Sequence, residues 1–129
     1  MVQPARLQSY KKGHWAESLA KFYFLIKGYK VLVRRYKTPV GEIDLILQKD
    51  KALIFVEVKL RRSIDEALES ISHKNKKRVE KAALHFIAHN TKYQGFGYQF
   101  DVFAVIMRGR FVPNGFRHLD NAWEGSMLL

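Results

Sequence analysis

Apolar and polar positions recur along the chain with two different periods, which separate helical from extended segments. Residues 9–27 show the helical period, and Gly28 provides a C-terminal stop. The large apolar side chains of this segment fall on one stripe, which predicts its buried face: Trp15, Leu19, Phe22 and Ile26. Residues 29–36 are rich in β-branched and aromatic side chains, so we expect a strand there.

After a break at residues 37–39, two apolar runs predict a β-hairpin: GEIDLIL from Gly41 and ALIFVEVKL from Ala52. The helical period then returns. The remaining predicted elements are a short helix over residues 64–71, a longer helix over 74–89, a strand over 99–107 and a short extended piece near 116–119. The order α-β-β-β-α-β predicts one α/β domain, residues 1–129, with a mixed sheet flanked by helices.

A two-residue turn at Asp50 and Lys51 fixes a register for the hairpin. One face then carries three apolar pairs: Leu47 with Ile54, Leu45 with Val56, and Ile43 with Val58. The other face pairs Ile46 with Phe55, Asp44 with Glu57, and Glu42 with Lys59. A slip of one residue would break every apolar pair, and this favours the register.

In this register Asp44 and Glu57 stand across from each other, with Cβ atoms about 5 Å apart. Like charges placed so close destabilise a sheet, and they cost more in an apolar setting. A divalent cation removes the conflict, because Mg²⁺ is often held by one or two carboxylates, waters and a substrate phosphate. Lys59 shares the face and can orient a water or stabilise charge on a phosphate. The alternative is a solvated charged face. Leu53 and Phe55 argue against it, because these apolar residues lie on the same side of the strand as Glu57.

The charge balance narrows the class of partner. The 129 residues include 23 Lys and Arg against 12 Asp and Glu, which gives a formal charge of +11. Such an excess attracts polyanions, so nucleic acid is the favoured partner, an anionic membrane surface is its rival, and plain solubility is the third explanation. We find no apolar run long enough to span a bilayer and no signal peptide, and there are no cysteines. We therefore expect a cytoplasmic protein.

The hairpin motif also resembles a known signature. Asp44, twelve residues and then Glu57-Val58-Lys59 look like the PD-(D/E)xK nuclease pattern, with Ile43 in place of the proline. In order and spacing, further segments resemble the small bacterial YraN-like family: GHWAESLA at Gly13, GEIDLI at Gly41, FVEVKLR at Phe55, residues 71–83, FDVFAV at Phe100 and LDNAW at Leu119. This resemblance covers nearly the whole chain and implies a restriction-endonuclease-like fold, similar to archaeal Holliday-junction resolvases.

The resemblance also implies roles for individual residues. Asp44 and Glu57 would be metal ligands, the carbonyl of Val58 a further ligand, and Lys59 the catalytic lysine. Glu17 matches the acidic residue that related nucleases bring to the site from the first helix, as a ligand or to position water. The alternative for Glu17 is an ion pair with Lys21, four residues further along the helix.

Basic residues near this motif are candidate nucleic-acid contacts: Arg61, Lys74, Lys77, Arg78 and Lys81. All but the first lie at the start of the longer helix, where the positive end of the helix dipole favours phosphate. A solvated helix face is the alternative.

We therefore expect an endonuclease dependent on Mg²⁺ or Mn²⁺ that hydrolyses phosphodiester bonds, in branched or otherwise structured DNA. The alternative is a non-catalytic protein that binds nucleic acid or scaffolds a complex on the same fold. The expected partner is nucleic acid, with DNA foremost and no membrane involved, and a homodimer is compatible with either function.

Overall fold

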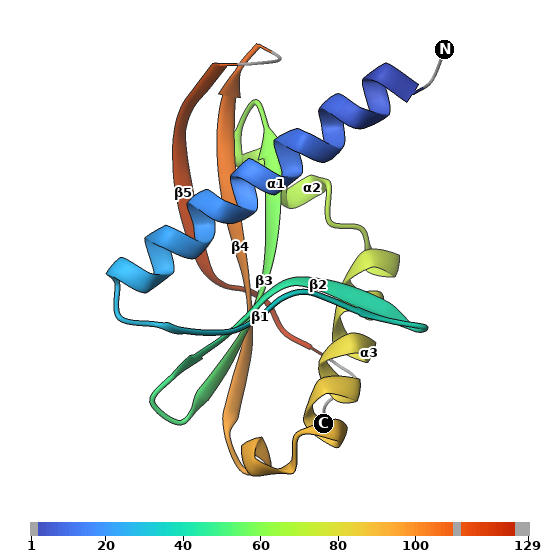
Figure 1. Ribbon diagram of the computed structural model, residues 1–129, viewed down its shortest axis with the longest axis vertical. Coiled ribbons are helices and arrows are strands. Elements are labelled where there is room, and N and C mark those ends of the chain that lie inside the picture. The colour runs from blue at the N-terminus through green and yellow to red at the C-terminus, as the bar shows by residue number, and fades with distance from the viewer. Residues whose placement is uncertain (1–2, 110–111, 126–129) are drawn as a thin grey trace.

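The computed structural model describes the backbone of residues 3–109 and 112–125, and side chains from residue 14 onward within those ranges. The elements, in chain order, are α1 (Gln3–Ile26), β1 (Lys30–Thr38), β2 (Gly41–Lys49), β3 (Ala52–Arg61), α2 (Ile64–Glu69), α3 (His73–His89), the 3-10 helix η1 (Thr91–Tyr93), β4 (Gly97–Arg108) and β5 (Val112–Trp123), as Figure 1 shows.

The strands form one mixed sheet in the order β1-β2-β3-β4-β5. Strands β3 and β4 pair in parallel, and the other neighbours are antiparallel. A parallel pair needs a crossover connection, which α2 and α3 provide. The predicted α/β architecture, a mixed sheet flanked by helices, is confirmed. Strand β5 is much longer than the short extended piece predicted near residues 116–119: it has 12 residues and pairs with β4 from Val112 to Trp123, with two irregularities in the register.

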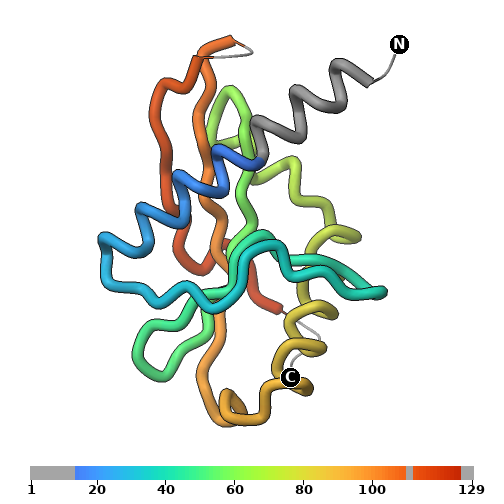
Figure 2. The backbone as a smooth tube through the Cα atoms, viewed as in Figure 1, coloured from blue at the N-terminus to red at the C-terminus, as the bar shows by residue number. Residues whose placement is uncertain are grey.

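Helices cover both faces of the sheet. The buried face of α3 packs with Ile46 and Phe55 of the sheet and uses the apolar residues Val79, Ala82, Ala83 and Phe86. Helix α1 packs on the opposite face, over Leu45, Val56 and Phe103. In Figure 2 the blue tube of α1 crosses β3 and β4, while α2 and α3 lead from the end of β3 back to β4. None of the helices within the described ranges is long and apolar enough to cross a membrane.

The buried face of α1 differs from the predicted stripe. Ala16, Ala20 and Phe24 are fully buried, whereas Phe22 is 57% exposed and Ile26 is 85% exposed. The helix is therefore rotated relative to the prediction from its large apolar residues. The physical reason is close packing: two alanines one turn apart let the helix backbone approach the sheet, and a larger residue there would hold it away.

The hairpin register is confirmed from the turn inward, where Lys49 pairs with Ala52, Leu47 with Ile54 and Leu45 with Val56. The prediction is wrong beyond that point, because the ladder between β2 and β3 ends at Leu45 and Val56. Ile43 lies in the apolar cluster on the α3 side, not with Leu45 and Leu47. The start of β2 thus leaves β3 and turns toward α3 together with β1 (Figure 1).

Candidate active site

The predicted acidic residues and Lys59 come together where β2 parts from β3. Asp44 is on β2, Glu57 and Lys59 are on β3, and Glu17 is on α1. They are close enough for their charges to act on one another: Glu17 and Lys59 both influence the ionisation of Asp44, and Asp44 and Lys59 influence that of Glu57. The predicted face-to-face ladder pair of Asp44 and Glu57 is absent, but the two side chains still meet in one polar cluster.

Asp44 is half-buried and unfavourably placed for a charged carboxylate. The pKa of Asp44 is raised from 3.8 to about 6, mainly by burial and in part by the negative charges of Glu17 and Glu42. The backbone N–H of Val58 donates to Asp44 Oδ2 at 2.8 Å and, with the charge of Lys59, holds the increase in check. The backbone pairing of β2 with β3 has ended before this point, so the Val58 N–H of β3 donates to a side chain of β2 and not to its backbone.

The surroundings of Glu57 also oppose the charged form of its carboxyl group. Burial raises the pKa of Glu57 well above its usual 4.5, and the neighbouring Asp44 raises it further. Lys59 and the backbone amide of Asp44 lower it only in part. The negative charge of Asp44 opposes the ionisation of Glu57. The fold therefore holds two carboxyl groups together without a full set of compensating protein charges.

Glu17 is 8% exposed and makes a strong contact, but not the one weighed from the sequence. Its Oε1 accepts from Arg35 Nε at 2.6 Å, so its ion-pair partner is Arg35 on β1 and not Lys21 on its own helix. Within the described residues, Glu17, Asp44 and Glu57 do not bring three ligand oxygens to within 4.8 Å of one another. In this arrangement Glu17 borders the carboxylate pair and is anchored by Arg35.

The donor set of this cluster fits a hard divalent cation. Asp44 and Glu57 supply carboxylate oxygens, the ligands that Mg²⁺ and Mn²⁺ prefer. The Val58 N–H points to Asp44, and in a strand the carbonyl of the same residue points to the same side, where its oxygen could serve as a third ligand. A cation bound between two half-buried carboxylates would also reduce their repulsion and stabilise the fold.

The five predicted nucleic-acid contacts are all exposed. Arg61 ends β3, two residues beyond Lys59, and its guanidinium donates to the Leu60 carbonyl. The other four lie in the first half of α3. That helix packs directly on the start of β2, since a Cβ added at Gly41 would lie 1.9 Å from the Arg78 carbonyl oxygen. The basic helix start is therefore adjacent to the strand that carries Asp44.

A second polar group was missed from the sequence. Asp101, His118 and Asp120 bring ligand atoms to within 4.8 Å of one another and could hold a metal ion. Asp101 is fully buried and satisfied: Oδ2 contacts His118 Nε2 at 2.6 Å, and Oδ1 accepts from Gln99 and from the Asn121 amide. These bonds tie β4 to β5. The signal was present in the FDVFAV and LDNAW segments, but pairing them needs the register of the two strands.

The fold and this site define a class: an α/β protein with a half-buried carboxylate–lysine cluster at the point where two sheet strands part. The family described as "Uncharacterised protein family UPF0102" matches residues 16–105, which include Glu17, Asp44, Glu57 and Lys59. The chain belongs to this family, as the resemblance to YraN-like proteins implied.

Individual relatives agree with this assignment. A UPF0102 protein of Mesorhizobium japonicum is 41% identical over 102 residues, which cover 79% of this chain and 82% of the relative. One from Nitrobacter winogradskyi is 36% identical over 94% of this chain and 98% of its own length. One from Caulobacter vibrioides is 39% identical over 90% of this chain and 89% of its own.

Proposed function

We propose that this protein is a metal-dependent nuclease that hydrolyses phosphodiester bonds in branched or otherwise structured DNA. The single observation that supports this most is the pairing of Asp44 and Glu57 beside Lys59, with burial and mutual repulsion opposing the charged form of both carboxyls. Ordinary surface carboxylates are seldom placed where their charged form is opposed in this way. Carboxyls with such perturbed ionisation cluster at functional sites, including sites that hold a cation and a phosphate. The order of these residues on β2 and β3 also matches the nuclease signature described above.

In the proposed reaction, a water oxygen adds to phosphorus and one phosphorus–oxygen ester bond breaks. The products are a phosphate monoester and an alcohol, and the proton lost by the water balances the one gained by the leaving oxygen. A Mg²⁺ or Mn²⁺ ion, when bound, would supply Lewis-acid stabilisation of the negative charge that develops on the phosphate oxygens.

The residues of the chain have separate parts in this scheme. Asp44, Glu57 and the Val58 carbonyl hold the cation, and the ammonium of Lys59 lies against the attacking water or a phosphate oxygen. Glu17, anchored by Arg35, positions water at the border of the site. Arg61 and the basic start of α3 hold the flanking phosphates.

The test is a cleavage assay on duplex, single-stranded, flap and four-way-junction DNA with Mg²⁺ or Mn²⁺. Wild-type protein should cut a structured substrate, and Asp44→Asn should abolish cutting and weaken binding of the cation. Lys59→Ala should abolish cutting but keep the cation, because the lysine is not a ligand. Asp50→Asn is the matched control: it makes the same change at the exposed far end of β2, where the left-handed backbone suits Asn, so activity should persist.

Binding measurements in the same series separate this proposal from its alternative. Both variants should still bind DNA, since their basic surfaces are intact. If wild-type protein binds structured DNA but takes up no divalent cation in a titration and cuts none of the substrates, the enzyme proposal is wrong. A non-catalytic nucleic-acid-binding or scaffolding protein then remains.

A further inference from the structure

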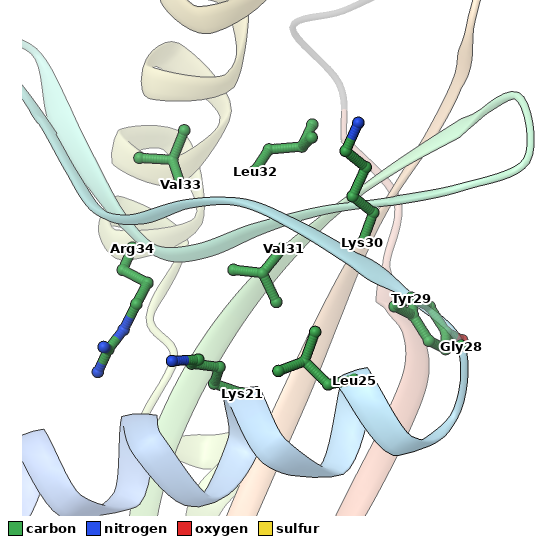
Figure 3. Close-up of a pocket in the computed structure, with 9 residues that line it drawn as sticks. All are labelled: Lys21, Leu25, Gly28, Tyr29, Lys30, Val31, Leu32, Val33 and Arg34. Carbon is green, nitrogen blue, oxygen red and sulfur yellow. The ribbon is translucent and has the colours of Figure 1, made fainter.

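A groove of about 700 Å³ separates the second half of α1 from β1, outside the carboxylate cluster. Figure 3 shows how its walls are built: Lys21 and Leu25 rise from α1, and Val31 and Arg34 project from β1 into the same gap. Lys30, at the end of the groove, points to the other side of β1. The lining includes three cationic residues and contains no Asp or Glu.

Within the part of the chain that the structure describes, no ion pair involves a cation of this groove. In that part, ion pairs join Arg35 to Glu17 and His118 to Asp101. Arg34 donates only to the Ser18 hydroxyl, at 3.3 Å, and Lys21 lies 5.4 Å from the centre of the Phe22 ring. Two cations face one space across an aliphatic floor, so the complementary occupant is an anion with apolar parts.

The groove lies beside the candidate site along both α1 and β1. Lys21 is one helical turn beyond Glu17 on α1, a rise of about 6 Å. On β1, Arg34 contacts Ser18, and the next residue, Arg35, holds Glu17. A chain of phosphates that entered the groove between Lys21 and Arg34 would therefore lead to the carboxylate cluster.

We propose that this groove binds a single-stranded segment of the nucleic acid, with Lys21 and Arg34 contacting successive phosphates and Leu25 and Val31 contacting sugars or bases. The inference rests on the proposed function, because it names the part of the substrate that reaches the same site. A volume of about 700 Å³ is large enough for a few nucleotides. Proteins that bind single strands without regard to sequence combine a positively charged groove with aromatic side chains for base stacking, and Tyr29 lines this groove.

The experiment compares Lys21→Gln/Arg34→Gln with a control pair, Lys51→Gln/Lys92→Gln, which removes the same charge from exposed lysines outside the groove. Binding of a fluorescent oligothymidylate and of a blunt duplex is measured over a series of salt concentrations. The groove variant should bind the single strand about tenfold more weakly at low salt. The slope of log affinity against log salt should become shallower by about 1.4, or about 0.7 for each lost phosphate contact. Duplex binding should change less than twofold, and the control pair should match wild type for both probes.

Each failure has its own signature. If the groove pair and the control pair weaken single-strand binding equally, or if wild-type protein does not bind the single strand, the groove proposal is overturned even where cleavage is observed. If the groove pair selectively loses the single strand while wild-type protein cuts no DNA, the nuclease proposal fails and the groove stands. Thermal melting of the two double variants shows whether they are equally stable. We expect equal stability, because the substituted side chains are exposed or half-exposed.

Discussion

Asp44 is held in surroundings that oppose its own charge. Burial and the nearby Glu17 and Glu42 raise the pKa of Asp44 to about 6, while the single hydrogen bond from Val58 only moderates the rise. Because the folded protein binds this proton more tightly than the unfolded chain, the proton stabilises the fold. That contribution is complete below about pH 4 and is lost as the pH rises through about 6.

Asp44→Asn should therefore make the metal-free protein more stable at pH 7, by about 1–3 kcal/mol. The amide oxygen can still accept from Val58, while the buried charge is gone. Urea unfolding in the presence of a chelator, at several pH values between 4 and 7, measures the effect. Wild-type stability should fall across this range, and the variant should keep only the shallower decline that Glu57 causes, since the pKa of Glu57 is also raised.

Added Mn²⁺ should reverse the order of stability at pH 7, because a cation that binds only the folded state stabilises it by mass action. Wild-type protein should gain stability, and Asp44→Asn should gain little. Asp50→Asn serves as the control, with wild-type behaviour in both conditions. A variant that is less stable than wild type in chelator, with an unchanged pH profile, would show that the Asp44 charge is well compensated, contrary to this account.

At the scale of elements, one glycine sets how closely α3 approaches the sheet. A Cβ at Gly41 would lie 1.9 Å from the carbonyl oxygen of Arg78, a backbone atom that cannot move without shifting the helix. This contact brings the basic start of α3 beside the strand that carries Asp44. It also fits the turn of β2 away from β3, which ends their ladder at Leu45.

Gly41→Ala should destabilise the protein by about 1–3 kcal/mol or more, as overpacking against a rigid neighbour does. Chemical denaturation measures this loss. Gly97→Ala is the matched control, because its Cβ would meet the Lys51 carbonyl oxygen at 3.9 Å, an ordinary contact. Equal stabilities of the two variants would mean that α3 yields freely and does not fix the path of β2.

The same elements explain what could be predicted from the sequence. Alternation along the hairpin gave the correct register from the turn to Leu45, since each pair there depends only on local pleating. It could not give the departure of Ile43, which depends on α3 packing against Gly41. The apolar pattern also could not predict which face of α1 is buried. Ala16 and Ala20 are buried, whereas the larger Ile26 is exposed. A prediction from apolar periodicity favours large side chains, but close packing of the helix on the sheet favours small ones.

The candidate site was predicted in its members but not in its geometry. Asp44, Glu57 and Lys59 were found from spacing and strand pairing, yet they meet beyond the end of the ladder and not across it. The partner of Glu17 was missed because Arg35 lies on another element, and only the fold brings them to 2.6 Å. The Asp101–His118 contact was missed for a related reason: irregularities in the β4–β5 register decide which side chains meet.

At the scale of the whole molecule, two basic surfaces of different shape contribute to the net charge of +11. The groove between α1 and β1 is an open depression with Lys21, Lys30 and Arg34 in its lining. The start of α3 is an exposed helix face with Lys74, Lys77, Arg78 and Lys81. A structured DNA has both duplex and single-stranded parts, and we expect the helix face to hold the duplex.

Lys77→Glu/Arg78→Glu should therefore weaken binding to every duplex or junction DNA alike, by about tenfold or more at low salt, whatever its sequence. Phosphate contacts carry no sequence information, and each lost contact should make the salt dependence shallower by about 1. Lys51→Glu/Lys92→Glu gives the same change in net charge at exposed positions away from α3, and it should have a smaller effect on the slope. Fluorescence anisotropy with two unrelated duplexes and one junction, over a series of salt concentrations, measures this.

If both charge reversals act equally, the attraction is a property of the net charge and α3 is not a binding face. If wild-type binding does not depend on salt, or does not occur, phosphate recognition fails as a whole and a protein partner becomes the better explanation for the basic surface.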